Sequence, residues 1–442
     1  MESAFAMKSP SLLIALALLP LTISAAALPA FPGAEGAGST TPGGRGGRVL
    51  FVTTLADSGP GSFRSACEAE GPRIVVFRVA GTIALRSPIN VRNPYLTIAG
   101  QSAPGDGVCL RDNTFGISTH DVIVRFLRSR LGDETKREAD CIDLNNGARN
   151  CILDHCSATW SIDECLSTSG VNADCTIQWC LIGESLNRSK HAKGAHGYGS
   201  LARANGPMSW HHNLWIHNDA RNPRLGDNYG RDGRNPSFDV RNNVMYGFGG
   251  TASGLTQGKF TVNYVGNYLR PGPGSRAKTP ITIGTPSELV FHLAGNLWEP
   301  DPALSEEKYF SLLEAEGRRQ VTLSEKPFPM PPVTTVSARE AYELVLASVG
   351  ASRPVRDAVD TRLIRQVRDR TGELINSQSE VGGWPDLKSG SLPVDSDNDG
   401  IPDAWEIARG LNPNEASDNS RVLTSGYTAI EEYLNELARR GL

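Results

Sequence analysis

The segment from Cys151 to Gly183 reads CILDHCSATWSIDECLSTSGVNADCTIQWCLIG, a series of short apolar runs separated by polar and small residues. This segment and Cys141 together contain three pairs of cysteines, and the two members of each pair are 24 residues apart in the chain. The pairs are Cys141 and Cys165, Cys151 and Cys175, and Cys156 and Cys180. Zinc sites use close C-x₂-C pairs, which this chain lacks. The constant interval instead indicates that the cysteines stack on successive turns of a repeat.

The repeat extends well beyond the cysteines. Seven runs superpose in chain order: VIVRFLRSR, CILDHCSAT, CTIQWCLIG, MSWHHNLWI, FDVRNNVMY, NYVGNYLRP and FHLAGNLWE. Their common turn position holds Arg128, Cys156, Cys180, Asn213, Asn243, Asn267 and Asn296. Repeated short strands with insertions of variable length are typical of a solenoid. The sequence therefore predicts an all-β fold, a right-handed parallel β-helix, over residues 28–300.

Stacking leads to two further expectations about this fold. Equivalent residues on neighbouring coils of a β-helix lie roughly 4.8 Å apart. The asparagines would then form a ladder in which their side-chain amides hydrogen-bond to one another. The stacked cysteines would lie within the Cα separation of roughly 4.4–6.8 Å that a disulfide needs. They would equally suit a column of free thiols in the core, so both alternatives stay open.

Residues 1–27 have the pattern of a secretory signal peptide. Lys8 precedes the apolar run SLLIALALLPLTIS and the small residues Ala25 to Ala27. That run is too short for a membrane anchor, and no later apolar stretch has spanning length, so we expect a secreted, extracellular protein without a membrane span. The formal net charge of −4 gives no reason to expect a nucleic acid partner. We expect a monomer.

Two regions depart from the strand repeat. Residues 58–71 are expected to form a helix that caps the open N-terminal end of the β-helix. Residues 301–390 combine a proline-rich stretch with helical patterns, one of which opens with a capping-box sequence from Ser337 to Glu340. We expect this helical and irregular extension to wrap or flank the solenoid.

The segment DSDNDGIPDAWE near the C-terminus has the spacing of a calcium-binding EF-hand loop, with Gly400 at the sixth position. Oxygen ligands are expected from Asp395, Asp397, Asp399, the carbonyl of Ile401, Asp403 and Glu406. Residues 391–442 are therefore predicted to form a small EF-hand-like or dockerin-like module that binds Ca²⁺. It would act as a structural calcium clip or as an attachment piece for a docking partner.

Four motifs occur in the order LTIAGQSAPGDGVCL, CILDHCSATWSIDECLS, KHAKGAHGYGS and DARNPRLGD. Together they resemble the pectate lyases of the parallel β-helix type, over the chain from about Phe31 to Trp298. The resemblance implies a calcium-dependent lyase that cleaves 1,4-linked α-D-galacturonan, the acidic plant or algal polysaccharide polygalacturonate. Its β-elimination reaction would yield 4,5-unsaturated oligogalacturonides.

The resemblance also implies a calcium site. The calcium-binding aspartate of the family matches Asp163. The family's second acid, four residues later, falls on Ser167, which is a departure. Glu164 would supply the missing oxygens, or the metal would arrive only with substrate. Asp140, one coil earlier, is a weaker ligand candidate.

Substrate-binding cations are implied in the same way. The family's lysine matches Lys193, with His191 two residues before it as a further substrate contact. The R-x-P-R-x-R motif of the family matches Arg221 and Arg224, but its last arginine falls on Gly226. One substrate-binding cation is then missing, or it comes from Arg231 or Arg234.

Arg221 is the residue that the resemblance assigns as the base. The C5 proton of galacturonate is weakly acidic, and calcium at the C6 carboxylate would stabilise the enolate-like intermediate. An arginine has a pKa of roughly 13.8, so only neighbouring positive charges and desolvation would lower it enough for this role. An alkaline activity optimum is therefore expected.

Alternatives remain within and outside this class of enzyme. A pectin lyase, or a lyase acting on a related uronate polymer, would share the fold, but Asp163 and Lys193 favour the free acid. A glycoside hydrolase would need paired carboxylates, and no convincing pair is evident. A non-catalytic polysaccharide-binding β-helix is the alternative from another class, supported by Ser167 and Gly226.

Overall fold

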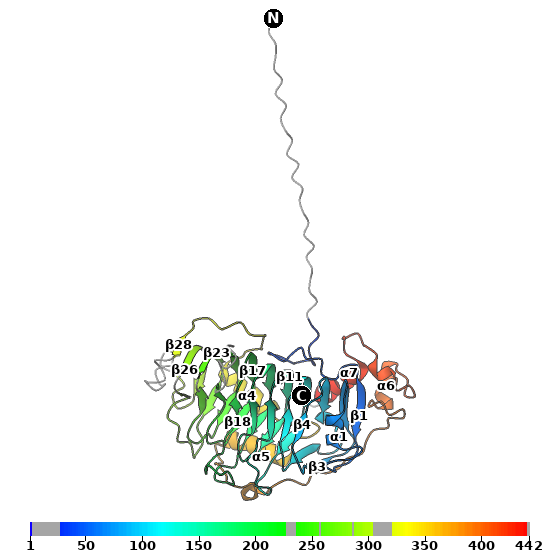
Figure 1. Cartoon of the computed structure of the whole chain (residues 1–442), viewed down its shortest axis with the longest axis horizontal. Helices are drawn as coiled ribbons and strands as arrows, with labels where there is room; N and C mark the ends of the chain where they lie inside the picture. The colour runs from blue at the N-terminus through cyan, green and yellow to red at the C-terminus, as the bar shows by residue number, and fades with distance from the viewer. Residues whose placement is uncertain (2–26, 227–235, 256–257, 285–286, 304–320, 440–442) are drawn as a thin grey trace.

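The computed structural model describes residue 1 and residues 27–226, 236–255, 258–284, 287–303 and 321–439. In this part of the chain, short strands wind repeatedly through three parallel sheets, and each circuit makes one coil of a β-helix (Figure 1). The fold class predicted from the repeat is confirmed. We name the sheets A, B and C in the order in which the chain enters them.

Sheet A consists of β1 (Arg48–Val52), β2 (Arg73–Phe77), β5 (Leu96–Ala99), β8 (His120–Arg125), β11 (Arg149–Asp154), β14 (Ala173–Gln178), β17 (Pro207–His211), β20 (Ser237–Arg241), β23 (Gly258–Val265), β26 (Ser287–Ala294) and β28 (Val321–Leu323). Sheet B consists of β3 (Gly81–Ala84), β6 (Val108–Arg111), β9 (Arg128–Arg130), β12 (Ser157–Thr159), β15 (Leu181–Gly183), β18 (Leu214–Ile216), β21 (Val244–Tyr246), β24 (Tyr268–Arg270) and β27 (Leu297–Trp298).

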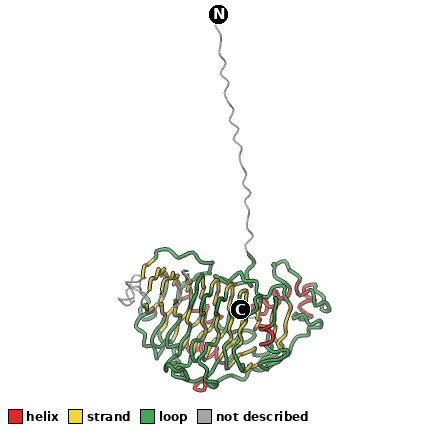
Figure 2. Tube along the Cα trace, in the orientation of Figure 1, coloured by secondary structure: helices red, strands yellow, loops and turns green. Residues whose placement is uncertain are grey.

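Sheet C consists of β4 (Ile89–Val91), β7 (Phe115–Ile117), β10 (Ile142–Asn145), β13 (Leu166–Ser169), β16 (Leu201–Ala202), β19 (Arg224–Leu225), β22 (Ser253–Leu255) and β25 (Ile281–Ile283). The helices are α1 (Phe63–Glu68), η1 (Gly100–Ser102), α4 (Ala338–Ser348), α5 (Ala358–Asp369), η2 (Gln378–Val381), α6 (Asp403–Arg409), η3 (Asp418–Ser420) and α7 (Ala429–Arg439). Figure 2 shows strands and loops alternating through the coiled body, with helices confined to short pieces of the chain.

The inward-facing side chains of the three sheets form one apolar core. Strand β10 shows the pattern, since Ile142 and Leu144 are buried whereas Asp143 and Asn145 are only partly covered. Neighbouring side chains of a strand point to opposite faces, so every second residue faces the core. The alternate residues of sheet C are thereby left on the outside of the coil, where the candidate site lies.

The turn from sheet A into sheet B contains the predicted asparagine ladder. Nδ2 of Asn213 donates to Oδ1 of Asn243 at 3.0 Å, and the same 3.0 Å contact joins Asn243 to Asn267. It also joins Asn267 to Asn296. These bonds satisfy amides that would otherwise be buried without partners, at a cost of about 1–3 kcal/mol for each.

The predicted turn column is wrong at its first member. The strand register pairs Arg128 with Ser157, so Leu127 is the equivalent of Cys156. Arg128 is the first residue of β9, and its guanidinium donates to the carbonyl of Ala351. Arg128 was predicted at this turn because most of the aligned residues there are polar. In the structure the turn position of this coil is occupied by the apolar Leu127.

The cysteine question is decided in favour of free thiols. All eight cysteines are free and buried. Cys151 and Cys175 are register partners in neighbouring strands of sheet A. Burial raises the pKa of the Cys175 thiol well above its usual value. The cysteines therefore act as small apolar residues that fill columns of the core.

Helix α1 covers the N-terminal end of the coils, as expected for residues 58–71. The Ser62 hydroxyl caps the helix by accepting a hydrogen bond from the backbone N–H of Ser65. The ring of Phe63 packs at 5.7 Å from the rings of Phe77 and Phe115. The helix thus closes the apolar interior against water.

The described part of the extension, with α4 and α5, packs along sheet B. Tyr342 of α4 and Leu363 of α5 belong to the core cluster of the solenoid. Arg130 of β9 is fully buried and pairs with Asp357 and Asp360, each at 2.8 Å. These ion pairs join α5 to the coils.

Asp360→Ala is expected to destabilise the protein by about 3–5 kcal/mol, because it removes one of two carboxylates that neutralise a buried guanidinium. Asp360 is itself fully buried and also accepts a hydrogen bond from the Ser157 hydroxyl. The free energy of unfolding in urea measures the effect, with Asp369→Ala at the exposed end of the same helix as the control. Equal stability of the two variants would contradict a structural role for the pair.

The C-terminal residues pack on the first strands of sheet A. Ile401, Trp405 and Tyr433 form an apolar cluster with Ile74 and Val76 of β2. Helices α6 and α7 accordingly lie at the end of the solenoid that carries β1 (Figure 1). The predicted calcium module is thus placed against the β-helix itself.

Most of the predicted signal peptide, residues 2–26, lies outside the described residues. Within the described part of the chain, no helix has both the length and the apolar character needed to cross a bilayer.

Candidate active site

The turn from sheet B into sheet C stacks Asp140, Glu164, Tyr198 and Ala220 on successive coils. Parallel bridges join Glu164 to Tyr198 and Tyr198 to Ala220. Oδ1 of Asp140 accepts a hydrogen bond from the backbone N–H of Glu164 at 3.1 Å. Since Arg221 follows Ala220, this one turn brings the predicted calcium acids and the predicted base together.

Three carboxylates converge at this turn. Asp140, Asp163 and Glu164 offer oxygens that lie within 4.8 Å of one another. Burial raises the pKa of Asp140 well above its usual value, and the nearby carboxylates of Asp143 and Asp163 raise it further. A divalent cation would relieve this repulsion, and calcium takes roughly six to eight oxygen ligands, carboxylates among them. The residues present therefore fit a calcium ion.

Arg221 is held by two contacts that favour its charged form. Its guanidinium forms an ion pair with Glu164. It also lies over the ring of Tyr198, with Cζ 4.1 Å from the ring centroid. Its side chain is 16% exposed, so the pair is partly shielded from water. Glu164 therefore pairs with the predicted base and also belongs to the carboxylate cluster.

Gly199 allows the backbone of Arg221 to approach the preceding coil. The N–H of Ser200 donates to the carbonyl of Arg221 at 2.7 Å. A Cβ atom at Gly199 would lie 2.6 Å from that carbonyl oxygen, closer than real contacts allow. Gly199, the second glycine of GYGS, is thus required by the position of the Arg221 backbone.

The imidazole rings of two histidines lie against the carboxylate of Asp163. Nε2 of His196 lies 3.0 Å from Asp163 Oδ1, and Nε2 of His191 lies 3.8 Å from Asp163 Oδ2. The two imidazole rings stack with their centroids 3.7 Å apart. The side chain of His191 is only 3% exposed. The structure therefore places His191 against the carboxylate of Asp163 rather than in the open.

The remaining predicted cations lie around this cluster. Lys193 is exposed, and its backbone N–H donates to Nδ1 of His191 at 3.1 Å. Arg224 opens β19 in sheet C, and its charge lowers the pKa of Tyr198, which burial raises. Arg231 and Arg234, the candidates for the missing cation, lie outside the described residues.

Comparison with known proteins agrees with this arrangement. No protein-family model matches the chain. The chain is 38% identical over 429 residues to a probable pectate lyase C of Aspergillus terreus, covering 95% of this chain and 96% of that protein. A probable pectate lyase C of Aspergillus flavus is 37% identical over 438 residues, covering 97% and 98%. The chain belongs to the pectate lyase family. It is an enzyme of the polysaccharide lyase class.

Solved structures support the fold of this pectate lyase family member. An arginine-to-lysine variant of a Bacillus subtilis pectate lyase aligns with a TM-score of 0.52 at 14% identity, over 73% of this chain and 97% of that one. The cedar pollen allergen Jun a 1 aligns with a TM-score of 0.50 at 17% identity, over 72% and 92%.

Several residues of the site were missed by sequence reasoning. Tyr198 and His196 lie in the quoted motif KHAKGAHGYGS, but nothing in their spacing showed that they contact Arg221 and Asp163. The backbone N–H of Ala192 also donates to the carboxylate of Glu138 at 2.8 Å, and Glu138 belongs to a different loop. These contacts arise because successive coils bring distant segments of the chain together.

The C-terminal loop forms a second candidate metal centre. Carboxylate oxygens of Asp395, Asp397 and Asp399 lie within 4.8 Å of one another, as do those of Asp399, Glu406 and Asp418. Both oxygens of Asp397 and of Glu406 are buried without a hydrogen-bond partner among the described residues. Burial, together with the charge of Asp397, raises the pKa values of Asp399 and Glu406 to about 7. Such a set fits a calcium ion.

The two carboxylate groups differ in two places from the predicted ligand set. Asp418 lies outside the predicted loop and was not predicted as a ligand. Asp403 accepts hydrogen bonds from the backbone and hydroxyl of Ser396, at 2.7 and 2.6 Å, and belongs to neither carboxylate group. Helix α6 begins at Asp403, within the predicted loop, but residues 384–402 contain no helix before it, so an EF-hand helix pair is not confirmed.

Proposed function

We propose that this protein is a secreted, calcium-dependent pectate lyase that cleaves polygalacturonate by β-elimination and releases 4,5-unsaturated oligogalacturonides. The observation that carries the proposal is the single turn at which Asp140, Asp163 and Glu164 converge beside Arg221. Secretion is supported by the signal-like pattern of residues 1–27, and the names of the relatives support the substrate.

Asp140, Asp163 and Glu164 would hold the calcium ion. When bound, calcium withdraws charge from the C6 carboxylate of the substrate and makes the C5 proton more acidic. Lys193 and Arg224 bind the acidic sugars and add positive charge near the developing enolate. Arg221 then accepts the C5 proton, and the bond from C4 to the bridging oxygen breaks as the C4–C5 double bond forms. The departing oxygen takes a proton from water and becomes a hydroxyl group.

Glu164 links the calcium site to the base. In the structure, its carboxylate pairs with the guanidinium of Arg221, which stabilises the charged form of the arginine. A carboxylate that turns towards a cation shares less of its charge with Arg221. Occupation of the calcium site would therefore favour loss of a proton from Arg221.

We expect activity on polygalacturonate to increase from neutral to alkaline pH. An arginine base is active only when deprotonated, and a rising pH increases that fraction. Initial rates of ultraviolet absorbance by the unsaturated product, measured with calcium and with a chelator, test this. Calcium-dependent absorbance with an alkaline optimum is the expected result. An acidic optimum would count against Arg221 as the base, and binding without any product would favour the polysaccharide-binding alternative.

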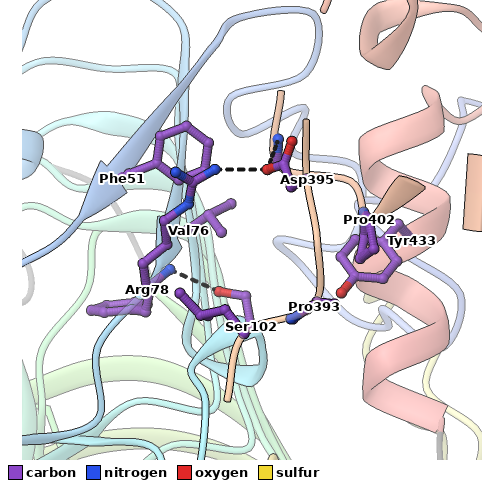
Figure 3. A pocket seen from close by; sticks show the side chains of 11 residues that line it. Phe51, Val76, Arg78, Ser102, Pro393, Asp395, Pro402 and Tyr433 are labelled. Atoms are coloured by element: carbon purple, nitrogen blue, oxygen red, sulfur yellow. Dashed lines mark hydrogen bonds and ion pairs between the residues drawn. The ribbon is translucent and has the colours of Figure 1, made fainter. Parts of the chain in front are cut away.

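We also propose that the C-terminal loop is a structural calcium clip. Arg78 of the β-helix pairs with Asp395 at 2.7 Å and donates to Asn398 at 2.8 Å. Figure 3 shows Arg78 reaching from beside Phe51 across a pocket to Asp395. The apolar face of the module, including Tyr433, already packs on sheet A. These contacts favour a clip within the chain over a docking site for a partner.

A further inference from the structure

The outward face of sheet C carries a row of residues that the strand register aligns. Asp143 pairs with Ser167, and Leu201 pairs with Arg224. Their neighbours Ile142 and Leu166 are buried in the core, so the aligned residues point outward. One row of sheet C therefore connects Asp143 to the predicted substrate-binding Arg224, beside the acidic turn.

Asp143 lies near Asp140, one of the three proposed calcium acids. Its charge raises the pKa of Asp140, and Asp140 in turn hydrogen-bonds to the hydroxyl of Ser167. Nδ2 of Asn145 donates to Oδ2 of Asp143 at 3.0 Å, while Oδ1 is buried without a hydrogen-bond partner. A buried carboxylate oxygen without a partner is costly in the absence of a cation. Asp143 thus adds a further carboxylate near Asp140 on the outward face of sheet C.

Arg203 occupies the next outward row of the same sheet. Thr168 pairs with Ala202, and Ala202 pairs with Leu225, so the following residues Ser169, Arg203 and Gly226 are aligned. The charge of Arg203 lowers the pKa of Asp143, which burial raises to about 6. The guanidinium therefore lies on the face that carries the acids.

Gly226 itself is unsuited to an arginine. Its φ of 104° lies in the left-handed region, where the backbone of residues other than glycine is strained. A cation needed at this level of the sheet is better carried by the preceding coil, roughly 4.8 Å away, than by residue 226.

We propose that Asp143 is a ligand of the calcium site and that Arg203 binds a carboxylate of the uronate substrate. Each lies one coil before the position, Ser167 or Gly226, at which this chain departs from the family motif. The inference rests on the proposed lyase function and supplies the acid and the cation that the motif lacks.

Calcium titration by calorimetry tests the first role, with calcium alone as the probe. Asp143→Asn is expected to weaken calcium binding at this site about tenfold or more, because affinity follows the number of charged ligands. Ser167→Asp in the same variant is expected to restore binding, since it returns an acid to the neighbouring coil. Asp174→Asn, at an exposed acid of β14, is the matched control. The C-terminal loop should give an unchanged second binding event.

Steady-state kinetics and binding of trigalacturonate in the presence of calcium test the second role. Arg203→Ala is expected to weaken trigalacturonate binding and to raise KM on polygalacturonate about 10- to 100-fold, with a smaller change in kcat. Arg92→Ala, at an exposed arginine of the N-terminal coils, is the control. Unchanged trigalacturonate binding in Arg203→Ala would overturn this role.

Asp163→Asn separates a failure of the inference from a failure of the proposed function. If Asp163→Asn loses calcium binding while Asp143→Asn binds as wild type, the role of Asp143 is overturned and the lyase proposal stands. If the wild type binds no calcium at this site and forms no unsaturated product, the proposed function fails, and the inference fails with it. Loss in both variants with rescue by Ser167→Asp supports the inference.

Discussion

Replacing Arg221 by alanine is expected to lower kcat on polygalacturonate by about 10²–10⁴-fold, the range that a general base contributes. The variant lacks the group that is proposed to accept the C5 proton, while Asp140, Asp163, Lys193 and Arg224, the residues proposed to bind calcium and substrate, remain. Trigalacturonate binding with calcium should therefore change far less than the rate. The initial rate of product absorbance, with substrate and calcium saturating, measures the effect.

Arg221→Lys and Arg92→Ala are the controls for this prediction. Lysine retains the charge but presents a compact ammonium in place of the planar guanidinium, so its rate should also fall strongly. Arg92 is exposed on the N-terminal coils, and its loss should leave the rate unchanged. A wild-type rate in Arg221→Ala would remove this residue from the chemistry, whatever its effect on binding.

Removal of calcium is expected to release the C-terminal module from the β-helix. Calcium at about 100 times its Kd stabilises the bound form by about 2.7 kcal/mol, which corresponds to about 100-fold in the opening equilibrium. In chelator, residues 391–439 should be cleaved by a protease about 100-fold faster, because the buried carboxylates of Asp397 and Glu406 repel one another. Limited proteolysis followed by mass spectrometry locates the cleaved bonds.

Two variants assign this effect to one of the two calcium sites. Glu406→Gln should make the module sensitive to protease even in calcium, while Asp163→Asn should retain calcium-dependent protection. Protection that is lost in Asp163→Asn and kept in Glu406→Gln would mean that the site beside Arg221, and not the C-terminal loop, stabilises the module.

The repeated strands were predictable because burial of alternate residues leaves a clear pattern in the sequence. The asparagine ladder followed from the same repeat, since Asn213 and Asn243 occupy equivalent turns. The error at Arg128 has the opposite cause. A shift of one residue in register changes which side chain occupies a turn. The polar Arg128 resembled the other turn residues in the sequence, so the apolar Leu127 was not recognised as the turn residue.

The candidate site was predictable only where residues lie within one motif. Asp163, Lys193 and Arg221 were proposed as site residues because of the motifs in which they lie. The pairing of Glu164 with Arg221, and the contact of Tyr198 with the same guanidinium, depend on contacts between coils. Spacing along the chain does not encode such contacts when the connecting loops vary in length.

A crystal structure of Arg221→Ala with calcium and an oligogalacturonate tests the central claim most directly. We predict a calcium ion bound by Asp163 and its neighbouring acids and also by a sugar carboxylate, with C5 of that sugar facing residue 221. Lys193 and Arg224 should contact the same oligosaccharide. Calcium and sugar bound elsewhere on the coils, with the turn at Asp163 left empty, would contradict the assignment of this turn as the active site.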